Sequence, residues 1–137
     1  MAKKQKTWVY SPSPQPKPKA PEDIKREVET KANALVEAAL KPTYVKPPPE
    51  DDRSNYIVDI YTKWYRNYFY FCAKYCVPGP NAIAPFFEAK FARMEYAGNA
   101  QFNLSYMRYT EEWWEVYPGF SIDECLQAIE KDPLFHP

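Results

Sequence analysis

The chain has few of the residues that most often build a catalytic or cofactor site. Its 137 residues include one histidine, three cysteines and three glycines. The histidine, His136, stands beside the C-terminus, so no serine or cysteine nucleophile has a credible base close to it in the sequence. The scattered glycines form no phosphate-binding loop. These absences argue against an enzyme, and we expect no cofactor.

Cysteine is too scarce, and odd in number, for a disulfide framework, which fits a reducing cytoplasm. Cys72 and Cys76 have a spacing that zinc ligands can have, with His136 or Cys125 as further ligands. A structural zinc site usually has a second close pair of ligands, and the sequence offers none. We therefore expect buried thiols that bind no metal.

Long apolar runs are also missing. No segment approaches the roughly 20 apolar residues that a transmembrane helix needs. The basic N-terminal residues are not followed by the apolar run of a signal peptide. These features predict a cytoplasmic protein that does not enter a membrane.

Charge is balanced in sum and uneven along the chain. Residues 1–19 carry five lysines and no acid, whereas residues 111–137 carry seven acids against one lysine. In residues 1–20, proline alternates with polar residues, which favours an extended and disordered tail. The apolar residues Trp8 and Tyr10 interrupt this tail, and we expect them to dock on the domain or on a partner.

Aromatic residues are abundant, at 18% of the chain. They do not all fit inside one small core, so some aromatic surface is expected to be exposed. This excess is the best indication of binding in the sequence.

The last third of the chain predicts three antiparallel strands. Residues 90–96 alternate in character, with Arg93 on one face and Lys90 on the other. A turn at 97–100 leads to a strand at 101–109, and a turn at 110–112 leads to a strand at 113–117. Trp113 and Trp114 should point to opposite faces of the sheet.

A helix is predicted to follow. Pro118-Gly119-Phe120 is expected to end the last strand, and Ser121 with Glu124 has the spacing of a capping box. Asp132-Pro133 should stop the helix. Its apolar stripe recurs at helical spacing, with Leu126 expected to point at the sheet: Ile122, Cys125, Leu126 and Ile129.

The strand AKFARMEY, the hairpin FNLSYMRYTEEWWEVYP and the helix SIDECLQAIEKDP resemble an uncharacterised bacterial family. It is the domain-of-unknown-function family numbered three thousand and twenty-four. The resemblance covers roughly residues 87–135. It implies an α+β fold and no known activity, and it carries over no functional residues.

The first two thirds of the chain predict a helix and an ambiguous aromatic segment. Residues 21–41 read as a helix that ends before Pro42, and residues 42–54 as a proline-rich linker. Residues 55–77 fit either a β-hairpin turning at Arg66-Asn67 or a helix. Their β-branched and aromatic content favours the hairpin.

The prediction is a small α+β protein: a disordered tail at 1–20 and one domain at 21–137. The domain would have an antiparallel sheet of about five strands, a hairpin plus a three-stranded meander, with an N-terminal and a C-terminal helix packed on it. The sequence leaves open which face of the sheet is exposed and which oligomeric state the protein has.

The favoured function is a non-enzymatic cytoplasmic interaction module that binds a protein. A lysine- and proline-rich arm and an aromatic-rich sheet surface would provide the contacts. The alternative is a single-stranded nucleic-acid or RNA binder, in which the arm contacts phosphates and exposed aromatics stack on bases. The candidate partner-binding residues are Trp8, Tyr10, Lys90, Arg93, Arg108, Tyr109 and Trp114.

Overall fold

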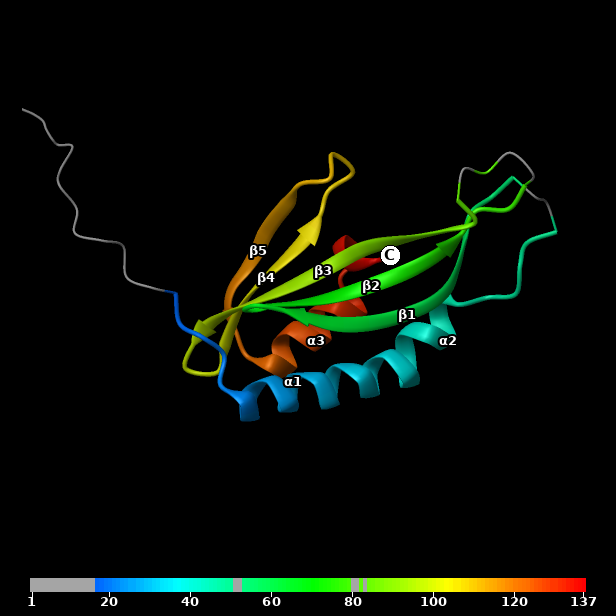
Figure 1. Ribbon diagram of the computed structural model, residues 1–137. Coiled ribbons are helices and arrows are strands. Elements are labelled where there is room, and N and C mark those ends of the chain that lie inside the picture. The colour runs from blue at the N-terminus through cyan, green and yellow to red at the C-terminus, as the bar shows by residue number, and fades with distance from the viewer. Residues whose placement is uncertain (1–16, 51–52, 80–81, 83) are drawn as a thin grey trace, which may run out of the picture.

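A five-stranded antiparallel sheet forms the centre of the protein, and its strands lie in the order β1-β2-β3-β4-β5 (Figure 1). The computed structural model describes residues 17–50, 53–79, 82 and 84–137. The strands are β1 (Tyr56–Tyr65), β2 (Tyr68–Cys76), β3 (Phe86–Gly98), β4 (Gln101–Met107) and β5 (Trp113–Phe120). The predicted α+β class and the five strands are confirmed, and so is the hairpin in residues 55–77.

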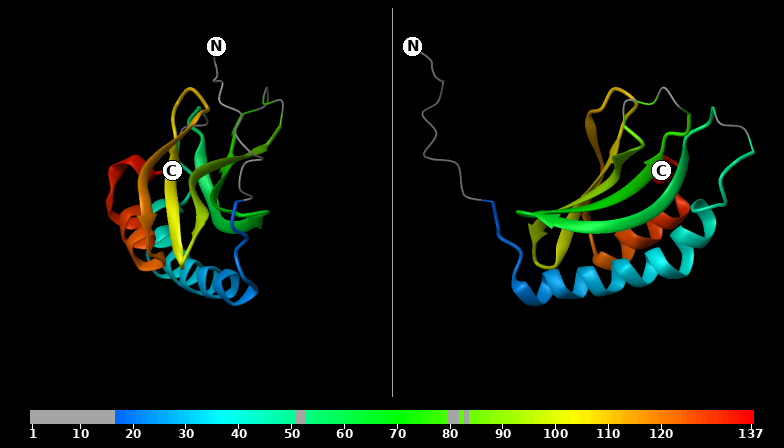
Figure 2. Two further views of the ribbon diagram at one scale, coloured as in Figure 1. Left: turned by 90° about the vertical axis from the view of Figure 1, so that its left-hand side faces the viewer. Right: turned by 45° about the vertical axis from the view of Figure 1, so that its right-hand side comes forward.

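Two helices lie on the same side of this sheet (Figures 1 and 2). The first is long and consists of α1 (Glu22–Leu35), a π-helical turn η1 (Val36–Leu40) and α2 (Lys41–Tyr44). The second is α3 (Ile122–Lys131), followed by the 3₁₀ turn η2 (Pro133–Phe135). The sheet is strongly twisted and bent above them (Figure 2).

Alternation along the strands sorts the side chains into two faces. The helix face carries the core, including fully buried Phe69, Phe71, Met94 and Leu104. The opposite side, which we call the open face, is covered by no helix of the described residues (Figure 2). Its central residues are Lys63, Tyr68, Tyr70, Lys90, Arg93 and Trp113.

The predicted end of the first helix at Lys41 is wrong, because the helix continues through Pro42 to Tyr44. The backbone N–H of Lys41 donates to the carbonyl of Val36, five residues back, in the π-turn. A wider turn accommodates the missing N–H and the bulky ring of the proline that follows. An α-helix has 3.6 residues per turn, so residues spaced four apart drift around its axis. The wider π-turn offsets this drift and keeps the residues that face the sheet in line: Val28, Ala32, Val36 and Leu40.

The predicted end of the last strand is also wrong, because β5 runs to Phe120. The pairing of β5 with β4 shifts its register around Pro118 and Gly119, so the strand continues past both residues. Gly119 has a positive φ of 68°. β4 in turn ends at Met107, two residues earlier than expected.

The capping box of α3 is confirmed. The Glu124 N–H donates to Ser121 Oγ at 3.1 Å, and the Ser121 N–H donates to Glu124 Oε1 at 2.8 Å. The apolar stripe of α3 has Cys125, not Leu126, near its centre. Cys125 is fully buried, whereas Leu126 lies at the margin of the stripe and is half-buried. Phe135 packs back into the core.

Candidate functional site

The centre of the open face is an arginine held between two aromatic rings. The Arg93 guanidinium carbon lies 4.7 Å from the ring centroid of Tyr68 and 4.9 Å from that of Trp113. Within the described chain, the buried Nε of Arg93 has no hydrogen-bond partner. The guanidinium is therefore held in place between the two rings, and the partly exposed side chain presents a fixed positive charge on the open face.

Tyr70 extends this cluster across the sheet. Its ring lies 5.8 Å from that of Trp113 and 6.1 Å from that of Tyr68, although strands β3 and β4 separate β2 from β5. Lys90 Nζ lies 5.7 Å from the Tyr70 ring centroid. Beside Tyr70 is a hollow of about 380 Å³ that Lys63, Tyr65 and Lys90 also line.

A carboxylate organises the basic residues next to this hollow. Glu88 accepts hydrogen bonds from Lys63 Nζ at 2.9 Å, from Lys90 Nζ at 3.1 Å and from the Tyr61 hydroxyl. These bonds, that of Tyr61 first, lower the pKa of Glu88 to about 2. Burial and the same carboxylate raise the pKa of Tyr61. One carboxylate thus pairs with two lysines of the open face and offsets one of their two positive charges.

The pattern of β2 explains why this face is aromatic and polar at once. Phe69 and Phe71 point to the core, and Tyr68 and Tyr70 point to the open face. Phenylalanine can be buried without a hydrogen-bond partner, whereas tyrosine keeps its hydroxyl near water. The alternation of Tyr and Phe in the sequence is therefore a usable indication of the two faces.

A bulge in β3 corrects the predicted placement of Lys90. Phe71 pairs with Ala92 and Cys72 pairs with Lys90, so Phe91 is an extra residue without a partner in β2. Beyond such a bulge the alternation of faces changes phase. Lys90 and Arg93 consequently lie on the same face, not on opposite ones.

The remaining predicted binding residues lie elsewhere. Arg108 stacks 4.3 Å from the Trp114 ring centroid and 5.8 Å from that of Tyr109, at the tip of the β4–β5 hairpin. Tyr109 is 91% exposed. Trp8 and Tyr10 lie outside the described residues. The structure therefore brings Lys90 and Arg93 together and keeps the Arg108 group apart from them.

The aromatic partners of Arg93 were missed as binding residues. Tyr68 and Tyr70 fall in the segment whose structure the sequence left ambiguous, so their face was undetermined. Trp113 and Trp114 were expected to point to opposite faces of the sheet, and this is confirmed. Trp113 contacts Arg93 on the open face, whereas Trp114 is 48% exposed and lies near Arg108.

The thiols of Cys72 and Cys125 are buried, on different sides of the sheet. Burial raises the pKa of Cys72 to about 11 and that of Cys125 to about 12, which keeps both as unreactive thiols. His136 packs against Tyr44, with 5.7 Å between ring centroids. Among the described residues, no group of three or more His, Cys, Asp or Glu could hold a metal ion.

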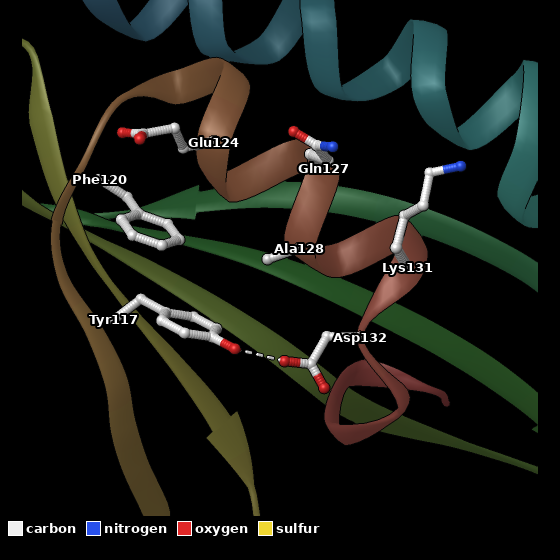
Figure 3. Close-up of a pocket in the computed structure, with 7 residues that line it drawn as sticks. All are labelled: Tyr117, Phe120, Glu124, Gln127, Ala128, Lys131 and Asp132. Atoms are coloured by element: carbon white, nitrogen blue, oxygen red, sulfur yellow. Dashed lines mark hydrogen bonds between the residues drawn. The ribbon is translucent and has the colours of Figure 1, made fainter.

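A second hollow, of about 470 Å³, lies between the edge strand β5 and helix α3 (Figure 3). Tyr117 and Phe120 form one wall, with their rings stacked 4.7 Å apart at an interplanar angle of 8°. The other lining residues come from α3 and its end: Glu124, Gln127, Ala128, Lys131 and Asp132.

Helices in the described part of the chain are too short or too polar to cross a membrane. A family model with the description "Domain of unknown function (DUF3024)" matches residues 20–137, which is far more of the chain than the predicted resemblance over 87–135. Neither the curated proteins nor the solved structures contain a match. The family match begins at Ala20, the first core residue of the described chain.

Proposed function

The chain belongs to this family of unknown function, DUF3024, and on that premise we propose that it is a non-enzymatic binding module whose open face receives a protein partner. The observation that carries the proposal is Arg93, whose partly exposed side chain holds its guanidinium between the rings of Tyr68 and Trp113 at the centre of the open face.

The composition of the open face supports a protein partner. Tyrosine, tryptophan and arginine are the residues most enriched where protein interfaces concentrate their binding energy. Tyr68, Tyr70 and Trp113 offer large rings that lose little side-chain entropy on binding, because the fold already holds them against one another.

The charges of the open face also favour a protein partner over a nucleic acid. Glu88 pairs with Lys63 and Lys90, and Lys17 pairs with Glu95 at 3.0 Å. A polyphosphate chain needs cations that are free to replace its counterions. Here Arg93 is the cation that the stacked rings present, so one carboxylate on the partner, surrounded by apolar groups, matches this surface.

The titrating groups also favour binding over catalysis. The lowered pKa of Glu88 arises from its hydrogen bonds to Tyr61 and the two lysines, and the raised pKa values of Cys72 and Cys125 arise from burial. Each shift has a cause within the packed fold. None of these three groups is a base or nucleophile aimed at a hollow.

The test is site-specific photo-crosslinking in native cells. The full chain carries a benzoylphenylalanine in place of Tyr70, which keeps an aromatic ring at the centre of the open face. A matched chain carries the same group in place of Tyr109, which is exposed but lies at the hairpin tip. We expect a discrete protease-sensitive adduct from position 70 that is absent from position 109.

Mass spectrometry then identifies the partner and the crosslinked residue, and binding is measured with both proteins purified. Arg93→Ala should weaken binding by about 2 kcal/mol or more, as expected for a central anchor. Arg93→Lys, which keeps the charge and loses the planar stack, should weaken it almost as much. Lys74→Ala, a cation near the end of the same face, should change it little.

A nuclease-sensitive adduct at position 70 would assign the open face to single-stranded nucleic acid instead. The row of Tyr68, Tyr70 and Trp113 is the feature such a ligand would use. No adduct at position 70, or equal binding by wild type and Arg93→Ala, would refute the role proposed for the open face.

A further inference from the structure

The described chain begins on the open face, beside the cluster of aromatic rings. Lys17 Nζ lies 3.0 Å from Glu95 Oε2, and Glu95 is the partner of Tyr68 in the register of β2 and β3. The side chains of Glu95 and Tyr68 point to the open face, because their neighbours Met94 and Phe69 are fully buried in the core. Lys17 is therefore held next to one of the rings that enclose the arginine.

The segment that follows Lys17 is tied to the end of the sheet. Asn67 Nδ2 donates to the Pro18 carbonyl at 2.9 Å, and Asn67 Oδ1 accepts the Ala20 N–H at 3.2 Å. From the start of α1, this segment climbs past the end of the sheet (Figure 1). The residues that precede Lys17 are consequently tethered beside the open face and not beside the helices.

The ten residues before Lys17 suit this surface in composition. Residues 7–16 carry no charge, so they bring no further cation to the basic residues of the open face. In residues 11–16, proline alternates with polar residues, which favours the extended polyproline II conformation. Segments of this kind dock on surfaces of tyrosine and tryptophan rings, because their fixed backbone loses little entropy on binding.

The ring cluster lies within reach of the tether. Five residues of extended chain span at most about 17 Å, which is the reach of Pro12 from Lys17. The Tyr70 ring lies 6.1 Å from that of Tyr68 and 5.8 Å from that of Trp113. A short tether gives an effective concentration on the order of millimolar, so a weak contact is populated although it adds little to the melting temperature.

We propose that residues 11–16 of the chain's own tail dock on the rings of Tyr68, Tyr70 and Trp113 and occupy the open face until a partner displaces them. The tail brings no carboxylate to Arg93, since residues 1–19 contain no acid. A partner that supplies a carboxylate therefore binds more tightly than the tail and replaces it. This blocking role rests on the function proposed above, because the partner must use the same face.

The test is intramolecular photo-crosslinking of the purified full chain. Benzoylphenylalanine replaces Tyr70 in one protein and, in the control, exposed Glu29, which lies about two turns along α1 and within reach of the same tail. Mass spectrometry of tryptic peptides then locates the link. We expect the peptide of residues 7–19 to be joined to position 70 in about fivefold or higher yield than to position 29.

A tail variant tests the prolines without changing any residue of the described structure. The triple replacement Pro12→Ala, Pro14→Ala and Pro16→Ala keeps the length and charge of the tail and removes its stiffness. It should lower the yield at position 70 several-fold, because the flexible segment loses more entropy on docking. Ser13→Ala, in the same segment, should leave the yield within about twofold.

Equal yields at positions 70 and 29, or a yield that the proline replacements do not change, would overturn the docking. Covalent dimers whose yield rises with protein concentration would assign the tail to a neighbouring molecule and overturn it as well. The two proposals fail separately, because the purified protein contains no partner. A missing tail link leaves the partner adduct in cells untouched, and a missing partner adduct removes only the blocking role.

Discussion

Phe69 and Tyr70 are neighbours in β2, and they show how differently the two faces of the sheet use aromatic rings. The Phe69 ring is fully buried against the helices, at 5.0 Å from Trp64 and 5.5 Å from Phe71. The Tyr70 ring stays partly exposed among Tyr68, Trp113 and Lys90. One face holds the fold together, and the other is an ordered surface that the fold leaves uncovered.

The sharpest test of this difference is the pair Phe69→Ala and Tyr70→Ala. Truncating a fully buried phenylalanine removes its transfer free energy and leaves a cavity, so we expect a loss of about 3–5 kcal/mol. Tyr70→Ala should cost about 1 kcal/mol, the scale of its ring contacts. Urea unfolding measures both. Losses of equal size would mean that the open face is a second core.

The next largest effects separate the residues of α3. Ile129 is 1% exposed, and Ile129→Ala should cost about 2–4 kcal/mol. Leu126 is only half-buried, so Leu126→Ala should cost about half as much, and exposed Gln127→Ala close to nothing. A larger loss of stability for Leu126→Ala than for Ile129→Ala would show that Leu126 points at the sheet, as predicted from the sequence.

The segment of residues 17–20 joins the two faces at one end of the sheet. Ala20 is 7% exposed among core residues, whereas Lys17 pairs with Glu95. Asn67 ties the segment down, because its Oδ1 accepts the Ala20 N–H at 3.2 Å and its Nδ2 donates to the Pro18 carbonyl at 2.9 Å. Only these last residues of the predicted tail are part of the described structure.

Two deletions measure what this segment contributes. Removing residues 1–16 should leave the melting temperature nearly unchanged. Removing residues 1–20 should lower stability by about 1–2 kcal/mol through the lost hydrogen bonds and the exposed core. A large loss from the shorter deletion would show that residues before Lys17 belong to the folded domain.

The smallest expected effect on stability comes from replacing Glu88 on the open face. The pKa of Glu88 is lowered from an ordinary 4.5 to about 2, so the folded protein holds its charged form more favourably than the unfolded chain does. This stability is fully present above about pH 4.5 and is lost as pH falls toward 2. We expect Glu88→Gln to cost about 1 kcal/mol at pH 7, since the group is partly exposed.

Unfolding of wild type and Glu88→Gln at several pH values gives the difference directly. The two curves should converge as pH falls from about 4.5 toward 2, and the titration of other carboxylates, such as Asp132, cancels in the comparison. A constant difference over this range would show that the carboxylate charge contributes nothing.

Local patterns predicted most of this architecture. The capping residues Ser121 and Glu124 and the turn at Arg66-Asn67 depend on neighbours in the sequence, and both are where the sequence placed them. The errors come from irregular backbone. The π-turn before Pro42, the extra residue at Phe91 and the register shifts near Pro118 each insert or shift one residue, and no periodicity argument detects that.

The candidate site was less predictable for the same reason. Lys90 and Arg93 were named as binding residues, but their common face depends on the bulge at Phe91. Tyr68 and Trp113 meet around Arg93 only because three separate strands bring them together. Contacts between distant segments leave little trace in a single sequence.

The ion pair between α1 and α3 has a consequence for how the chain acquires its structure. Lys31 Nζ lies 3.1 Å from Asp123 Oδ1, and 92 positions of sequence separate the two residues. The sheet is a meander of neighbouring hairpins, so its pairings can form one after another as the polypeptide leaves the ribosome. Its apolar side stays incompletely covered until the final helix has been synthesised. We therefore expect nascent chains that stop before Ile122 to depend on chaperones, because α3 is not yet present to cover the core.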